Sequence, residues 1–120
     1  MLTHETTSYS AIDFERINSG KIRAELSDRG AAVVRGLLPP GLCDAAAAMF
    51  DRDAGFRSTV VMERHGFGRG SYKYFSYPLP PFIQQLRARL YPVLAPIASE
   101  WSHACGTDIS YPPTLDEFLE

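Results

Sequence analysis

The residues best suited to bind a ligand lie close together, between positions 64 and 74. Two arginines flank a histidine and a glycine-rich stretch, and cations beside backbone amides can hold an anion. Tyrosines follow directly, and their hydroxyl groups could bond to a substrate. The sequence therefore predicts a substrate-binding group that consists of Arg64, His65, Arg69, Tyr72, Lys73 and Tyr74. The alternative, a solvated turn that binds nothing, stays open.

No residue is assigned as catalytic and none as a metal ligand. His4, His65 and His103 are far apart and begin neither an H-x-D nor an H-x-x-x-H pattern. We expect His103, beside Ser102, to be solvated or to cap a helix. The glycines between residues 66 and 70 do not form a dinucleotide-binding fingerprint, because the last glycine is misplaced and a strand follows instead of a helix.

The composition is that of an ordinary globular protein with room for one domain: 120 residues, 45% hydrophobic and 22% charged. The net charge of −2 gives no general attraction to nucleic acid or to a lipid surface, so neither is expected as a partner. No apolar run could span a membrane and no signal peptide is visible, which favours the cytoplasm. Cys43 and Cys105 are expected to be reduced and buried. The oligomeric state is not predicted.

The elements that must position the ligand-binding group form a predicted antiparallel hairpin. Ser58 to Met62 and Ser71 to Tyr77 have the residue types and the period of strands, and the glycines between them suit the connection. Side chains alternate along a strand. If Tyr72 and Tyr74 lie on one face, the other face therefore carries Lys73, Phe75 and Tyr77.

Helices are predicted around the hairpin from apolar spacing and from terminal residues. The predicted elements are a short helix over 11–17, a helix over 21–29 that ends at Gly30, a buried strand over 31–38, a helix that opens at Pro39–Gly41, and a long helix over 82–101 that Pro92 and Pro96 kink or divide and that buries Trp101. Residues 1–20 are expected to be a mobile arm with the short helix, and 21–120 part of a single domain. Thr114 and Glu117 match a capping box. Because so few residues follow it, the sequence predicts that the natural polypeptide continues beyond Glu120.

Three stretches together resemble the N-terminal portion of a bacterial iron(II)/2-oxoglutarate-dependent oxygenase of the prolyl-hydroxylase-like group: LSDRGAAVVRGLLPPGLCDAAAAMF, GRGSYKYFSYPLPP and LRARLYPVLAPIASEW. The resemblance implies an α+β fold, in which N-terminal helices and first strands flank a double-stranded β-helix (jelly-roll) whose catalytic part lies beyond this chain. The H-x-D…H iron triad of that family and its basic residue for 2-oxoglutarate have no counterpart here. The resemblance therefore implies Fe(II) and 2-oxoglutarate as cofactors of the parent chain, with none bound by this fragment alone.

Two functions are consistent with the sequence. By resemblance, the chain is the N-terminal part of an iron(II)/2-oxoglutarate-dependent dioxygenase that hydroxylates a peptide side chain or a small molecule, and it is inactive alone because the triad is absent. The alternative is a small non-enzymatic α+β module that binds an acidic peptide or an anion through the basic, aromatic hairpin.

Overall fold

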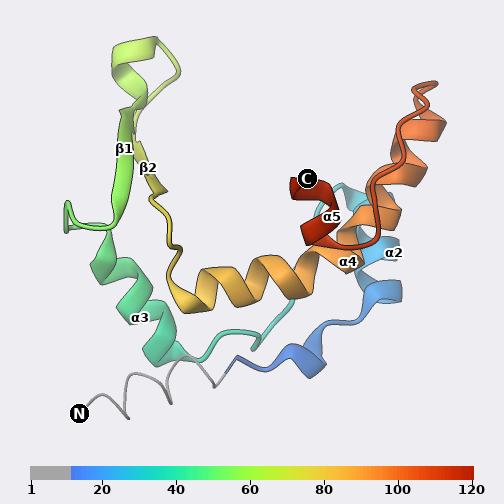
Figure 1. Cartoon of the computed structure of the whole chain (residues 1–120), viewed down its shortest axis with the longest axis horizontal. Helices are drawn as coiled ribbons and strands as arrows, with labels where there is room; N and C mark the ends of the chain where they lie inside the picture. The colour runs from blue at the N-terminus through green and yellow to red at the C-terminus, as the bar shows by residue number, and fades with distance from the viewer. Residues whose placement is uncertain (1–11) are drawn as a thin grey trace. The chain divides into compact units, whose positions relative to one another are not determined.

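A computed structural model describes residues 12–120 as an α+β fold with a two-stranded antiparallel sheet (Figure 1). In chain order the elements are η1 (Phe14–Arg16), α2 (Ser19–Arg29), α3 (Pro40–Met49), β1 (Phe56–Val61), η2 (Met62–His65), β2 (Ser71–Phe75), α4 (Pro81–Ala104) and α5 (Leu115–Leu119). The described chain divides into two compact units. Unit 1 contains the described residues up to Pro39 together with Pro81–Glu120, and unit 2 contains Pro40–Pro80. The expected mobile arm lies mostly outside the described residues, as does His4.

Unit 2 contains the predicted hairpin, with β1 and β2 antiparallel (Figure 1). The first turn of the connection is η2, which ends at Gly66 in the left-handed region at φ 73°. Glycine adopts this conformation without the steric cost that a Cβ brings. The strand boundaries differ slightly from the prediction, because Met62 belongs to η2 and Tyr77 lies beyond the end of β2. The hairpin itself is confirmed.

Strand β1 contains a β-bulge near its start. Phe56 lies opposite Phe75, but Ser58 lies opposite Tyr74, so Arg57 is an extra residue without a partner in β2. A bulge of this kind changes the direction in which the neighbouring side chains point. Phe56 stacks on Phe75 with ring centroids 5.0 Å apart, and the guanidinium of Arg57 lies instead over Tyr74.

Helix α3 begins at Pro40, as expected for a residue that lacks the N–H a first turn leaves unpaired. Leu42 is almost completely buried, with 1% of its surface exposed. Cys43 and Cys105 are free, but both are exposed, so the expectation that these thiols are buried is wrong. Only the helix face that packs against another element is buried. Leu42 lies on that face, whereas the next residue, Cys43, points in a different direction.

In unit 1, α2 has the predicted C-terminus, because Gly30 adopts a left-handed conformation at φ 75° and donates to Leu26 O over 2.8 Å. Asn18 caps the other end by accepting from Lys21 N–H at 3.0 Å. The short helix expected over 11–17 is only the single turn η1 within the described residues.

The predicted strand over residues 31–38 is wrong, because the structure has no strand there. A strand needs a neighbour for its backbone hydrogen bonds. The backbone of Leu37 instead accepts a bond from Asp13 N–H at 3.0 Å. Gly36 has φ 73°, and a Cβ at this position would come within 2.9 Å of the Arg16 guanidinium. Val33 is 64% exposed, so the apolar run is not a buried one.

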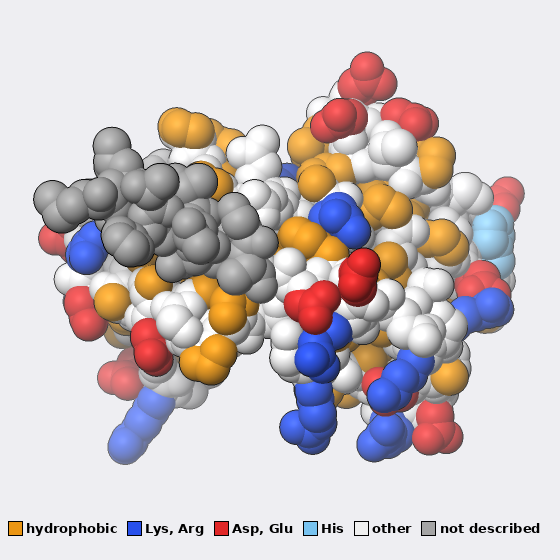
Figure 2. Space-filling model, turned by 90° about the horizontal axis from the view of Figure 1, so that it is seen from below, with side chains coloured by type: hydrophobic (Ala, Val, Ile, Leu, Met, Phe, Trp, Pro, Cys, Tyr) orange, Lys and Arg blue, Asp and Glu red, His pale blue; other side chains and the backbone are white. Residues whose placement is uncertain are grey.

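Helix α4 is continuous through Pro92 and Pro96, so the prolines do not divide it. Phe82, Ala95 and Ile97 are buried, but Trp101 is 46% exposed, and its prediction as a core residue is wrong. The spacing of apolar residues alone does not determine burial, because a helix face is buried only where another part of the chain covers it. Hydrophobic side chains consequently lie among charged ones on the surface (Figure 2).

Helix α5 confirms the predicted capping box, because Thr114 Oγ1 accepts from Glu117 N–H at 3.3 Å. The short helix packs on α4 through Phe118, whose ring centroid lies 5.6 Å from that of Tyr91. Tyr91 also donates its hydroxyl hydrogen to Pro112 O over 2.8 Å. None of the described helices is long and apolar enough to cross a membrane.

Candidate functional site

One face of the hairpin presents two exposed tyrosines. Tyr72 lies opposite Val60 in the ladder and Tyr74 opposite Ser58, so these four side chains share a face, which Arg57 joins at the bulge. We call Arg57, Ser58, Val60, Tyr72 and Tyr74 the tyrosine face. Tyr72 is 43% exposed and Tyr74 45%. The structure therefore confirms that the two tyrosines point the same way.

The two tyrosines of this face contact each other edge to face, with ring centroids 5.5 Å apart. Partial desolvation raises the pKa of the Tyr72 phenol, and the charge and the hydrogen bond of Tyr74 raise it further. The guanidinium carbon of Arg57 lies 5.3 Å from the centroid of the Tyr74 ring, within the range of a cation–π contact. The face thus combines neutral aromatic rings with a fixed cation.

Lys73 lies on the opposite face of the hairpin. Its ammonium donates to the backbone oxygen of Phe50 and, over 3.4 Å, to that of Arg52. The same nitrogen lies 4.5 Å from the ring centroid of Phe50 and 5.1 Å from that of Phe56. These contacts join β2 to the residues that follow α3, so Lys73 supports the tyrosine face from behind.

The tip of the hairpin carries Arg64, His65 and Arg69, all exposed. The His65 ring stacks near Phe67 at 6.4 Å, and Phe67 is itself 73% exposed. The hairpin over residues 56–75 contains the cations Arg57, Arg64, Arg69 and Lys73 and the single carboxylate Glu63, a net charge of +3 in a chain of −2. The hairpin therefore has a net positive charge in a chain that is acidic overall.

The structure thus brings together Tyr72 and Tyr74, places the charged tip residues beyond them, and puts Lys73 on the other side. Sequence analysis missed Arg57 and Phe67. Arg57 could not have been found from period, because an alternating strand without a bulge would place its side chain elsewhere. The exposed Phe67 between two glycines was a visible signal, since an apolar ring in a glycine-rich turn has little to pack against.

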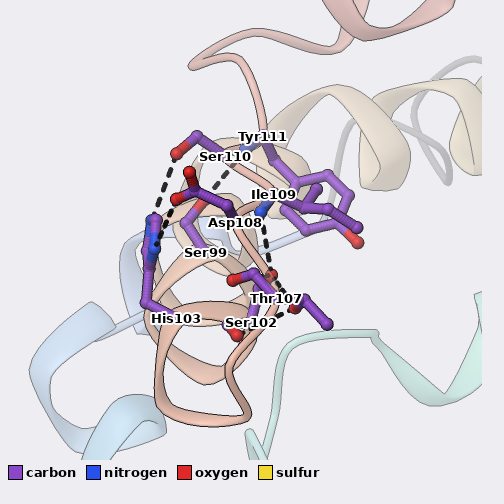
Figure 3. A network of polar contacts seen from close by, with 8 residues as sticks. All are labelled: Ser99, Ser102, His103, Thr107, Asp108, Ile109, Ser110 and Tyr111. Atoms are coloured by element: carbon purple, nitrogen blue, oxygen red, sulfur yellow. Dashed lines mark hydrogen bonds and ion pairs between the residues drawn. The ribbon is translucent and has the colours of Figure 1, made fainter.

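A second polar cluster lies at the end of α4 (Figure 3). His103 Nε2 is 3.2 Å from Ser110 Oγ, and His103 Nδ1 is 3.5 Å from Asp108 Oδ1. The order serine, histidine, aspartate is that of a hydrolase triad, which no motif had indicated. In such a triad the aspartate is buried and orients the imidazole, whereas the Asp108 side chain is fully exposed.

The neighbouring bonds of this cluster satisfy backbone groups where the helix ends. Ser102 Oγ accepts from Ile109 N–H at 3.2 Å, and Ser99 Oγ accepts from Tyr111 N–H at 2.8 Å (Figure 3). Thr107 Oγ1 donates to Ser102 O over 2.8 Å. The cluster therefore fixes the turn after α4. The His103 side chain contacts the side chains of Ser110 and Asp108, so the backbone groups are bonded by Ser99, Ser102 and Thr107 instead.

Unit 1 also contains a cavity of about 520 Å³ beside α2. Its lining includes Arg16, Lys21, Arg29 and Arg35. Two of these cations are already paired, since Arg16 Nε lies 3.0 Å from a carboxylate oxygen of Asp13 and Arg29 lies 3.8 Å from one of Glu25. Because carboxylates already neutralise two of its four cations, the cavity is poorly suited to a large anion.

An iron site of the type that the resemblance implies needs two histidines and a carboxylate with open positions on the metal. Within residues 12–120 no group of three or more histidine, cysteine, aspartate or glutamate side chains could hold a metal ion. The described residues therefore do not fit this centre.

Comparison with known proteins gives one match. Residues 70–120, which include β2, α4 and α5, match the model of a family described as an oxygenase that catalyses oxidative methylation of damaged DNA. No curated protein and no solved structure matches the chain. The oxygenase part of the resemblance is thereby supported, while the prolyl-hydroxylase-like group is not the family that matches.

The match also corrects one expectation. Nucleic acid was excluded as a partner on the basis of net charge, and this is wrong, because the matching family acts on DNA. The physical reason is that net charge averages over the whole chain. A hairpin of charge +3 can attract phosphates even though the remainder of the chain is acidic.

Proposed function

We propose that this chain is part of an iron(II)/2-oxoglutarate-dependent oxygenase that acts on damaged DNA. The observation that carries the proposal is the family match over residues 70–120, which includes both exposed tyrosines. The match supports an oxygenase and a nucleic-acid substrate. The resemblance, which covers about residues 21–120, supports the cofactors, Fe(II) and 2-oxoglutarate, and the jelly-roll core. A nucleic-acid substrate replaces the peptide or small molecule that the sequence suggested.

In this proposal the described residues provide a scaffold and a substrate surface. Residues 21–120 belong to one oxygenase domain, and the metal ligands come from polypeptide outside the described part, since its own donors do not fit. The substrate surface consists of Arg64, His65, Arg69, Tyr72 and Tyr74, with Lys73 holding it in place. A cytoplasmic location agrees with the unpaired state of Cys43 and Cys105.

The test uses the longest natural polypeptide that contains this sequence. It is incubated with Fe(II), 2-oxoglutarate, oxygen and an oligonucleotide that carries methylated bases. We expect succinate formation and a mass change of the oligonucleotide, both of which disappear when 2-oxoglutarate or Fe(II) is omitted. The matched control is the same oligonucleotide without the damage. If succinate formation did not depend on damaged DNA, the proposed substrate would be wrong. If no 2-oxoglutarate were converted, the proposed class of oxygenase would be wrong.

The 120-residue chain provides a second measurement. Its described residues lack a metal-binding donor set, so anaerobic titration with Fe(II) should give no tight binding. Tight binding of Fe(II) by this chain alone would contradict the proposed division of roles.

The second candidate function, a non-enzymatic module for an acidic peptide or an anion, is favoured by one observation, the exposed cations at the hairpin tip. It does not account for the family match.

A further inference from the structure

We propose that the tyrosine face binds single-stranded nucleic acid, with bases stacked on Tyr72 and Tyr74 and phosphates held by Arg57, Arg64 and Arg69. This inference rests on the proposed function only in taking the substrate to be nucleic acid. Nothing in the family match assigns a role to any single residue of the hairpin.

Both rings of the tyrosine face are exposed. Nearly half of the surface of each tyrosine is open to solvent, and the residues opposite the pair in β1, Ser58 and Val60, are small. An exposed aromatic ring gives a base a surface to stack on, and such stacking does not depend on base identity. The opposite face is not available in this way, because the Phe56–Phe75 stack and Lys73 occupy it.

Three arginines of the hairpin are exposed and could hold phosphates. The bulge places the Arg57 guanidinium over Tyr74, where it can pair with a phosphate while it stays stacked on the ring. Arg64 and Arg69 form no ion pair with another described residue. Their charge is therefore available to a polyanion. The net positive charge of the hairpin is complementary to the negative charge of nucleic acid.

The exposed rings of the tyrosine face suit single-stranded nucleic acid better than a duplex. Bases in a duplex are already stacked on each other, and their faces cannot reach a protein ring. A strand that uses the tyrosine face must therefore present unpaired bases. An acidic peptide would use the arginines but would leave the two tyrosines without a partner.

The experiment measures binding of the full 120-residue chain to a fluorescein-labelled single strand of roughly ten nucleotides, a typical length for such sites, by fluorescence anisotropy. We expect the double variant Tyr72→Ala/Tyr74→Ala to bind about tenfold more weakly or worse, since each stacked base contributes substantially. The double variant Tyr72→Phe/Tyr74→Phe keeps both rings and should bind within a factor of about two of the natural chain.

Charge is tested by a matched pair of substitutions. Arg57→Gln should weaken binding several-fold and reduce the slope of log affinity against log salt by about one, as expected for one lost phosphate contact. Arg29→Gln removes the same charge from α2 in unit 1 and should change neither quantity. Circular dichroism of each variant checks that it folds, and the phenylalanine and Arg57 variants test the proposal even if the alanine variant does not fold.

Four results would overturn the inference: no binding by the natural chain, equal binding by the folded alanine variant, equal loss from Arg29→Gln and Arg57→Gln, or oligoglutamate binding as tightly as the single strand. Failure here is distinct from failure of the oxygenase proposal. Oxidation of damaged DNA by the longer polypeptide without binding at this face would refute only the inference. Binding of nucleic acid at this face without any oxidation of DNA by the longer polypeptide would refute only the proposed oxygenase function.

Discussion

Neighbouring residues of β2 have opposite roles. Tyr72 and Tyr74 are exposed on one face, whereas Lys73 donates to backbone oxygens of Phe50 and Arg52 on the other. This alternation was predictable, because the period of a strand fixes which side chains share a face. The partners of Lys73 were not predictable, because they lie beyond the end of α3 and depend on how the chain turns between helix and strand.

We predict that Lys73→Met lowers the free energy of unfolding by about 1 kcal/mol, since it removes charged hydrogen bonds and a cation–π contact but keeps the aliphatic chain. Urea denaturation followed by circular dichroism measures the change. The control Arg69→Met at the exposed tip should leave stability unchanged, and equal losses from the two variants would contradict the supporting role of Lys73.

At the scale of elements, helix ends and the hairpin were predictable from sequence, while burial was not. Gly30 and Thr114 mark helix boundaries through local chemistry that the neighbouring residues complete. The failed strand over 31–38 and the exposed Trp101 depend on partners elsewhere in the chain. The bulge at Arg57 also has no local signature, so the extra cation of the candidate site could be found only in the structure.

Helix α5 is too short to be stable alone, so its contacts with α4 decide whether it forms. Tyr91 supplies one of them through its bond to Pro112 O. We predict that Tyr91→Phe increases amide hydrogen exchange in α5 roughly 2- to 10-fold, the value of one neutral hydrogen bond, and leaves α2 unchanged. Mass-spectrometric exchange measures this. Unchanged exchange in α5 would mean that ring packing on Phe118 is sufficient.

The same side chain should also give a dependence on pH. Partial desolvation, followed by the charges of Glu117 and Tyr111, raises the pKa of the Tyr91 phenol. The folded state therefore holds this proton more tightly than the unfolded state, and stability is present below the ordinary tyrosine pKa of about 10 and lost as pH rises above it. Denaturation at several alkaline pH values should show a smaller decline for Tyr91→Phe.

At the scale of the whole molecule, the chain has a small core and two compact units. The described sheet of unit 2 has only two strands, and such hairpins are marginally stable. We predict that the amides of β1 and β2 exchange by local opening, faster than those around Ala95 and Ile97 in α4. Native-state hydrogen exchange in low denaturant tests this, and a single common opening energy would contradict it.

The bulge in β1 has a consequence for the design of this surface. In a regular ladder, inserting one amino acid would exchange the two sides of everything that follows it. Here Phe56 still meets Phe75 while Ser58 and Val60 stay beside the tyrosines, because the inserted Arg57 has no opposite number. The strand thus accommodates an additional guanidinium, while the stacked phenylalanines and the two tyrosines stay on opposite sides of the hairpin.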